Sequence, residues 1–155
     1  MDSISSQVEF RFTISEASCP DPRLVASKNR KVLADVEGFL TICVNGRPIF
    51  EEPGVLLMEL GLDLVDWLRD MRSGHVRNFQ YVSIDYADGP LVGFVQDGEE
   101  RWSLESPWMN GPVLAGGHSI VSAAERYVED LATQLRRRYG IELSDYHVED
   151  PLVEP

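Results

Sequence analysis

Carboxylates at helical spacing are the residues of this chain best placed to do chemistry. Glu59, Asp63, Asp66 and Asp70 are four, three and four residues apart, so a helix through them carries all four on one stripe. Like charges at this spacing destabilise a helix by about 0.2–0.5 kcal/mol per pair. The stripe therefore predicts a recognition face for a cationic partner, and the alternative is a solvated face that charge keeps soluble.

The chain lacks the patterns that usually mark an active site. His75, His118 and His147 are far apart, and the HExxH, GxSxG and Walker motifs are all missing. We therefore predict no catalytic residue, no metal and no cofactor. The alternative left open is a small hydrolase whose carboxylates do acid–base work, with magnesium on the aspartates of the stripe.

Two tryptophans and an acidic C-terminal segment extend the candidate surface. Trp67 lies beside the stripe and Trp108 lies in a segment rich in proline and glycine. Tryptophan is a frequent anchor of protein interfaces, so both are predicted contact residues. The C-terminal segment offers a second acidic surface, made of Glu142, Asp145, Glu149 and Asp150.

The overall charge agrees with an acidic binding protein. The 155 residues hold 26 Asp and Glu against 14 Lys and Arg, a formal net charge of −12. Residues 32–117 alone hold 14 acidic and five basic side chains. Nucleic acids and anionic membranes bind basic surfaces, so the composition disfavours both as direct partners. A basic protein is the partner that this charge favours.

Hydrophobic periodicity predicts strands, a helix, more strands and a second helix. Strands are expected at 8–14, 32–44, 47–51, 79–86, 91–96 and 101–106, and helices at 55–72 and 119–139. Residues 107–117 are expected to form a loop. This order is typical of α+β proteins. We predict one antiparallel sheet of about five or six strands, with two helices, after the third and the sixth strand, packed on one face.

Length and composition favour one domain in a cytoplasmic protein. Residues 1–140 are predicted to form a single α+β domain, followed by an acidic tail at 141–155. The N-terminus has no basic and apolar stretch typical of a secretory signal, and no apolar run approaches a membrane span. Cys19 and Cys43 are too few for a disulfide framework, which favours free thiols in a reducing compartment.

Several segments resemble a family of small uncharacterised bacterial proteins over roughly residues 8–110. The residues that carry the likeness are Val36–Leu40, Asn45-Gly46, Phe50, Glu52-Pro53, Phe79–Ile84 and Trp102–Trp108. In size, charge and lack of a catalytic motif, the chain also resembles immunity proteins of bacterial polymorphic and contact-dependent growth inhibition toxin systems. That second resemblance implies a protein that binds one cognate toxin domain and blocks it.

The leading hypothesis is therefore an immunity protein that neutralises a toxin by covering its basic substrate-binding surface. A nuclease is the kind of toxin that this hypothesis favours. A nuclease must be basic to hold phosphates, and an acidic inhibitor can place carboxylates where the phosphates would lie. One alternative is a non-catalytic binding or scaffolding module, with a homodimer as one form of it. The other is the carboxylate-based hydrolase. The sequence leaves the oligomeric state open.

Overall fold

The protein is an α+β fold with two antiparallel sheets, which confirms the predicted fold class. The computed structural model describes residues 7–82 and 91–147. In these residues, sheet A has the strand order β1-β2-β3 and sheet B the order β4-β5-β6-β7. The strands are β1 (Val8–Ile14), β2 (Glu37–Val44), β3 (Arg47–Leu56), β4 (Phe79–Tyr81), β5 (Val92–Gln96), β6 (Arg101–Glu105) and β7 (Val113–Gly116).

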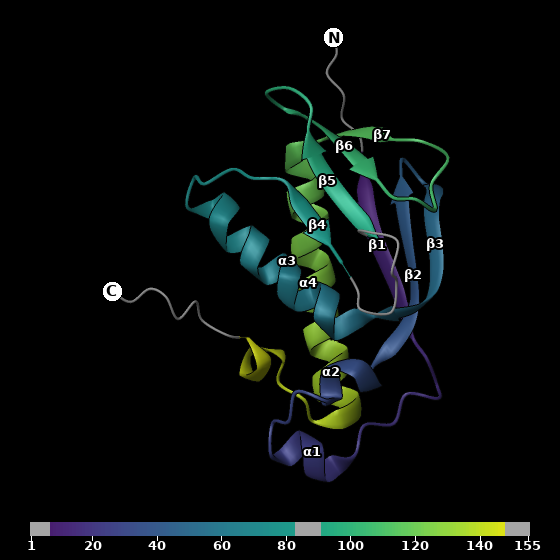
Figure 1. Ribbon diagram of the computed structural model, residues 1–155, viewed down its shortest axis with the longest axis vertical. Coiled ribbons are helices and arrows are strands. Elements are labelled where there is room, and N and C mark those ends of the chain that lie inside the picture. Colours follow the sequence, from purple (N-terminus) through teal and green to yellow (C-terminus); the bar gives the residue numbers. More distant parts are fainter. Residues whose placement is uncertain (1–6, 83–90, 148–155) are drawn as a thin grey trace.

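The helices are two long elements and several short ones. They are α1 (Pro22–Ala26), α2 (Val32–Asp35), α3 (Leu57–Arg72), α4 (Gly117–Tyr139) and the 3-10 helix η1 (Leu143–Tyr146). The two long helices α3 and α4 cross each other beside the sheets, and the short helices gather around the C-terminal end of α4 (Figure 1). No helix within the described ranges combines the length and the apolar character needed to cross a bilayer.

Sheet A contains a tight hairpin between β2 and β3. Asn45 and Gly46 form the turn with φ angles of 53° and 81°, the positive values that a two-residue hairpin requires. β3 is an edge strand, and an edge position leaves the missing N–H of Pro48 unpaired at no cost. The strand is longer than predicted, since it continues past Pro53 to Leu56.

Sheet B is an antiparallel meander with its apolar side turned toward α3. β5 and β6 are joined by a turn that begins at Asp97, where the Asp97 N–H donates to the Arg101 carbonyl over 2.8 Å. Phe79, Phe94 and Trp102 project from three neighbouring strands onto the same side of the sheet. The predicted strand at 79–86 is described only as far as Tyr81, and the Asp88-Gly89 turn lies outside the described residues.

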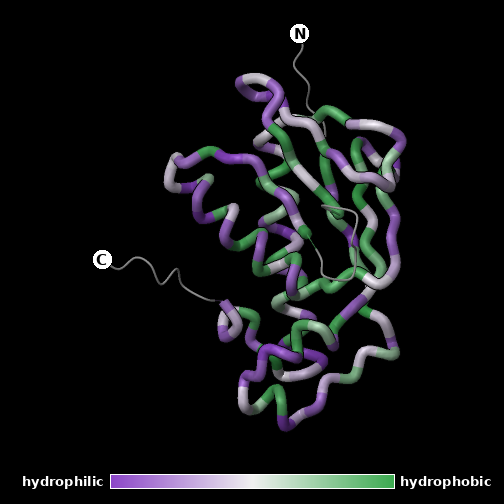
Figure 2. The backbone as a smooth tube through the Cα atoms, viewed as in Figure 1, coloured by the Kyte–Doolittle hydropathy of each residue, from purple (hydrophilic) through white to green (hydrophobic). Residues whose placement is uncertain are grey.

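Helix α3 carries one apolar and one acidic stripe, as its periodicity predicts. The tube alternates between hydrophobic and hydrophilic colours along this helix (Figure 2). Leu57, Leu60, Leu64 and Leu68 are buried. Gly61 permits close packing on α4, because a Cβ atom there would lie 2.8 Å from the Leu131 side chain. A buried apolar face of this kind supplies most of the stability of a helix in a folded domain.

Helix α4 closes the core, and the chain then turns back onto α3. Gly140 ends α4 in the left-handed conformation with φ 67°, as the sequence predicts for this position. Ile141, Leu143 and Tyr146 are buried after the turn. The first residues of the predicted acidic tail thus pack on the domain, and residues 148–155 lie outside the described part of the chain.

The prediction of a single sheet with five or six strands is wrong in its detail. The described residues hold seven strands in two sheets, and the second long helix follows the seventh strand. α3 lies between β3 and β4 in the chain, and within residues 7–82 and 91–147 no ladder joins sheet A to sheet B. Strand periodicity reports which residues face the core, but it does not report which strands pair.

Two segments were also assigned to the wrong element. Residues 32–35, predicted as the start of a strand, form the short helix α2, which follows a turn where the Asn29 Oδ1 accepts from the Lys31 N–H. Residues 113–116, predicted as loop, form β7. Both are runs of about four residues, too short for periodicity to separate helix, strand and loop.

Replacing Trp67 by alanine tests the arrangement of the core. Trp67 is fully buried against aromatic rings of sheet B, so Trp67→Ala should lower the free energy of unfolding by about 3–5 kcal/mol. Trp108→Ala is the matched control, because Trp108 is 40% exposed and its loss should change stability by less than about 1 kcal/mol. Urea unfolding followed by far-ultraviolet circular dichroism measures both, and equal effects would contradict this core.

Candidate interaction surface on helix α3

The four carboxylates of α3 lie on one stripe, but their surroundings divide them into two halves. We call the set of Glu59, Asp63, Asp66 and Asp70 the acidic stripe. All four residues are half-buried rather than fully exposed. Their neighbours come from β4, from the segment after α3 and from the segment after η1. These neighbours determine which carboxylates already have a cationic partner within the molecule and which are left for a binding partner.

The C-terminal half of the stripe is neutralised within the molecule. Asp70 accepts a hydrogen bond from the Arg77 Nε over 2.6 Å. Asp66 lies 3.2 Å from the Arg69 guanidinium and 2.7 Å from the His147 Nε2. The Arg77 guanidinium holds the pKa of the Asp70 carboxyl below its ordinary value. This half of the stripe therefore stabilises the fold.

The N-terminal half has no cationic ion-pair partner among the described residues. Glu59 accepts a hydrogen bond from the Tyr81 hydroxyl, a neutral donor, over 2.8 Å. No hydrogen bond or ion pair joins Asp63 to another residue among 7–82 and 91–147. Burial above all, and then the neighbouring charges of Glu59 and Asp66, raise the pKa of Asp63 to about 6, while the charge of Arg77 lowers it by less. A cation bound here would relieve this unfavourable charge.

Trp67 is not a surface anchor, which corrects the prediction made from its place beside the stripe. Its side chain is 0% exposed and makes ring contacts with Phe79, Phe94 and Trp102. The indole Nε1–H donates to the Arg77 carbonyl over 2.8 Å. Residue 67 lies one position after Asp66 and four after Asp63. Its side chain therefore lies beside the stripe, on the side of α3 that faces the core. Its size and buried contacts make it a core residue.

Trp108 lies at the surface in the loop between β6 and β7. Its side chain is 40% exposed, and its backbone N–H donates to the Ser106 Oγ over 3.1 Å. The exposure expected of a contact residue is thus present. Its loop connects two strands of sheet B, whereas the acidic stripe lies on α3.

The acidic residues of the C-terminal segment are only partly described. Glu142 makes two hydrogen bonds to the Arg136 guanidinium, of 2.8 and 3.1 Å, and Asp145 lies 3.7 Å from the Lys28 Nζ. These two carboxylates tie the segment to the domain. Glu149 and Asp150 lie outside the described residues. The segment reaches the stripe at His147, so the two candidate acidic surfaces meet at the contact with Asp66.

The partners of the stripe were not found by sequence reasoning. Arg77 and His147 lie outside α3, and no periodic pattern links a residue in a loop to a helix face. Arg77 is seven residues after Asp70, and His147 is 81 residues after Asp66. Within residues 7–82 and 91–147, no group of three or more His, Cys, Asp or Glu residues is arranged to hold a metal ion.

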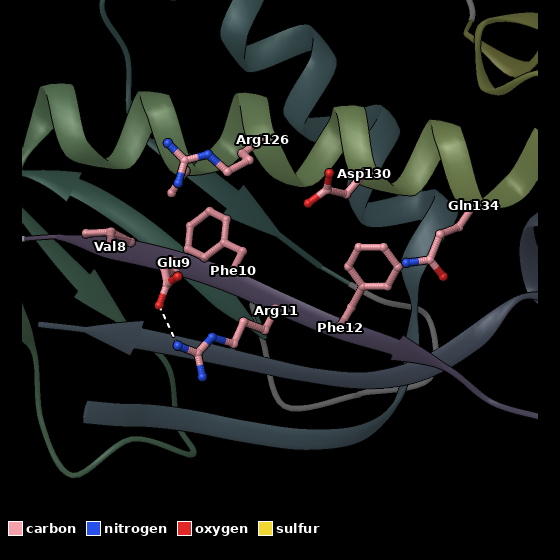
Figure 3. A pocket seen from close by; sticks show the side chains of 9 residues that line it. Val8, Glu9, Phe10, Arg11, Phe12, Arg126, Asp130 and Gln134 are labelled. Atoms are coloured by element: carbon pink, nitrogen blue, oxygen red, sulfur yellow. Dashed lines mark hydrogen bonds and ion pairs between the residues drawn. The ribbon is translucent and has the colours of Figure 1, made fainter. Parts of the chain in front are cut away.

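A small hollow with polar residues on its walls lies between β1 and α4. It has a volume of about 240 Å³, and Arg126, Asp130 and Gln134 of α4 line one side of it (Figure 3). On the other side, Glu9 and Arg11 form an ion pair of 2.6 Å, while Phe10 and Phe12 point toward the helix (Figure 3). The helix flanks the edge strand β1, and the charged groups around the hollow include both signs.

Residues 9–137 match the model of a family described as a domain of unknown function, DUF7878. The chain belongs to this family. The match runs from β1 to the last turn of α4, and it extends further than the resemblance seen in residues 8–110. No curated protein and no solved structure matches the chain. The predicted likeness to an uncharacterised family is confirmed, while membership of the DUF7878 family assigns no activity.

The contributions of Asp63 and Asp70 to the stability of the protein should change with pH in opposite directions. The pKa of Asp63 is raised in the fold from 3.8 to about 6, so the stability that its neutral form contributes is present below 3.8 and lost as pH rises through 6. Asp63→Asn should therefore stabilise the protein at pH 7 by about 1 kcal/mol. This figure allows for solvent screening of a half-buried group.

Asp70→Asn is the matched comparison. The pKa of Asp70 is lowered by Arg77, so its contribution is present above its unfolded pKa of 3.8 and disappears as pH falls through the lower folded value. This variant should be less stable than the wild type at pH 7 and approach it in acid. Thermal unfolding from pH 3.5 to 7.5 measures both, and shifts of the same sign would refute the division of the stripe.

Proposed function

We propose that the protein is a non-catalytic binding protein that neutralises a cognate toxin, acting as an immunity protein against a basic nuclease domain. The contact surface is centred on Glu59 and Asp63. The observation that carries this proposal is the position of Asp63, half-buried between two other carboxylates with no cation bonded to it within the described residues. A partner that supplies a lysine or arginine would complete the stripe.

The charge of the whole chain supports the same partner. A net charge of −12 attracts a basic protein at long range, and complementary charge raises association rates up to about 10⁸–10⁹ M⁻¹s⁻¹ at low salt. A nuclease must present a basic surface to hold phosphates, so carboxylates can occupy the place of its substrate. Fast capture suits an inhibitor of a lethal enzyme, because every free toxin molecule can act before it is bound.

The internal ion pairs reduce the number of carboxylates of the acidic stripe that are available to a partner. Asp66 and Asp70 already have cationic partners, so they hold α3 and its neighbouring segments in place. Glu59 and Asp63 lie one turn apart on the same side of α3 and face no such partner in the described residues. The proposed footprint is therefore the N-terminal half of the stripe, with Trp108 and the C-terminal carboxylates as further contact candidates.

Co-expression with the neighbouring gene tests the proposed function. The C-terminal domain of the protein encoded beside this chain should inhibit growth when expressed alone, and the chain should restore growth and elute with it as one complex. Loss of both effects would overturn the immunity function. A complex without growth protection would also overturn it, because binding would not block the toxic activity.

Charge variants then test the contact surface. In stopped-flow measurements, Glu59→Gln with Asp63→Asn should slow association by about tenfold at low salt and flatten its salt dependence, because exposed charges act at long range. Glu99→Gln with Glu100→Gln removes the same charge from the exposed turn between β5 and β6 and is the control. Equal slowing by both pairs would show that only net charge matters.

A further inference from the structure

The side of sheet B that faces away from α3 carries a largely apolar hollow. Its volume is about 540 Å³. Gln80, Gly93, Val95 and Glu105 form its floor on strands β4, β5 and β6. Its wall is formed by five residues of the following loop, Ser106, Pro107, Met109, Gly111 and Pro112. A hollow of this size is large enough for one or two side chains of a partner.

The strand register explains why a hollow lies here. Gly93 stands between Gln80 on one side and Glu105 on the other, so the middle of this row has no side chain. Any Cβ at residue 93 would lie 3.3 Å from the Phe79 carbonyl oxygen, closer than most such contacts. Glycine is therefore favoured at this position by the backbone beneath it, and its small size leaves the space above it open.

On the same side of sheet B, the next row of paired residues is apolar apart from one hydroxyl group. It contains Val95, Ser103 and Leu114 in register. Leu114 is 50% exposed, while Ser103 is 6% exposed and its Oγ has no hydrogen-bond partner among the described residues. Trp108 lies in the loop that walls the hollow. Exposed apolar groups around a concave surface are typical of a protein-binding site.

One charged residue lines the hollow among the residues that the structure describes. It is Glu105, and its side chain is exposed. No ion pair joins Glu105 to another residue in the part of the chain that the structure describes. An apolar group beside a cation would fill the hollow and pair with this carboxylate, whereas an acidic group would be repelled.

We propose that this hollow is a docking site for a basic protein partner, which inserts one aliphatic or aromatic side chain over Gly93 and pairs an adjacent lysine or arginine with Glu105. The inference rests on the proposed function, because it takes the partner to be a basic protein. It adds a second contact surface and states the chemistry that this surface recognises.

Strand β4 connects the hollow to the acidic stripe. Gln80 lines the hollow, and the next residue, Tyr81, points to the opposite side of the sheet and donates to Glu59 of the stripe. Successive side chains of a strand point to opposite sides, so one short edge strand separates the two surfaces. A standard interface buries about 800 Å² on each partner. One basic partner that approaches along β4 would reach both.

Short peptides test the docking site without the natural partner. Three acetylated peptide amides, Gly-Phe-Arg-Gly, Gly-Phe-Glu-Gly and Gly-Gly-Arg-Gly, are titrated into the ¹⁵N-labelled chain to millimolar concentration and followed by NMR. The Phe-Arg peptide should shift the amides of Gly93, Val95 and Glu105. The Phe-Glu peptide should bind about threefold more weakly for lack of the charge pair, and the Gly-Arg peptide at least about tenfold more weakly for lack of the ring.

Variants assign the charge preference to one residue. Glu105→Gln should remove the preference for the Phe-Arg over the Phe-Glu peptide, while Glu99→Gln, an exposed residue of the turn between β5 and β6, should keep it. Equal binding of the three peptides, shifts confined to α3, or no shift at all would overturn the docking site. The growth test of the proposed function is independent, so failure of one experiment does not decide the other.

Discussion

The packing of Trp67 is the interaction on which the rest of this structure depends. Its ring contacts Phe79, Phe94 and Trp102, residues from three neighbouring strands of sheet B, and so fixes α3 against that sheet. Its indole N–H holds the Arg77 carbonyl, and this bond places the Arg77 side chain beside Asp70. One buried side chain therefore orients the helix, docks the segment before β4 and neutralises one end of the acidic stripe.

The same helix shows how stability and binding make different demands on charge. Asp66 and Asp70 have ion-pair partners, whereas Asp63 is half-buried between like charges, and burial first and these charges second raise its pKa. A side chain without charge at residue 63 would remove this cost and preserve the apolar stripe on the other side of α3. The retained carboxylate is thus better explained by a contact made outside the chain than by the needs of the fold, which is the basis of the proposed binding role.

The sequence predicted the two long helices, the strands on either side of Asn45-Gly46 and the α+β class, because each depends on local pattern. It did not predict the division into two sheets, because pairing of strands depends on residues far apart in the chain. The candidate site was also predicted only in part. Helical spacing placed four carboxylates on one stripe, but only the fold brings Arg77 and His147 to it. Trp67 was misplaced because spacing could not tell the flank of a stripe from the core.

The two proposed contact surfaces would contribute differently to one complex. Charge at Glu59 and Asp63 acts over distance and mainly sets the rate of encounter, whereas an apolar side chain buried in the hollow over Gly93 would act at contact and mainly set the rate of dissociation. The net charge of −12 alone could attract any basic protein, so it gives little specificity. Specificity requires shape, and the hollow beside Glu105 combines shape with a single carboxylate. A partner selected by both surfaces would need a basic patch and an exposed apolar side chain at a fixed separation across β4.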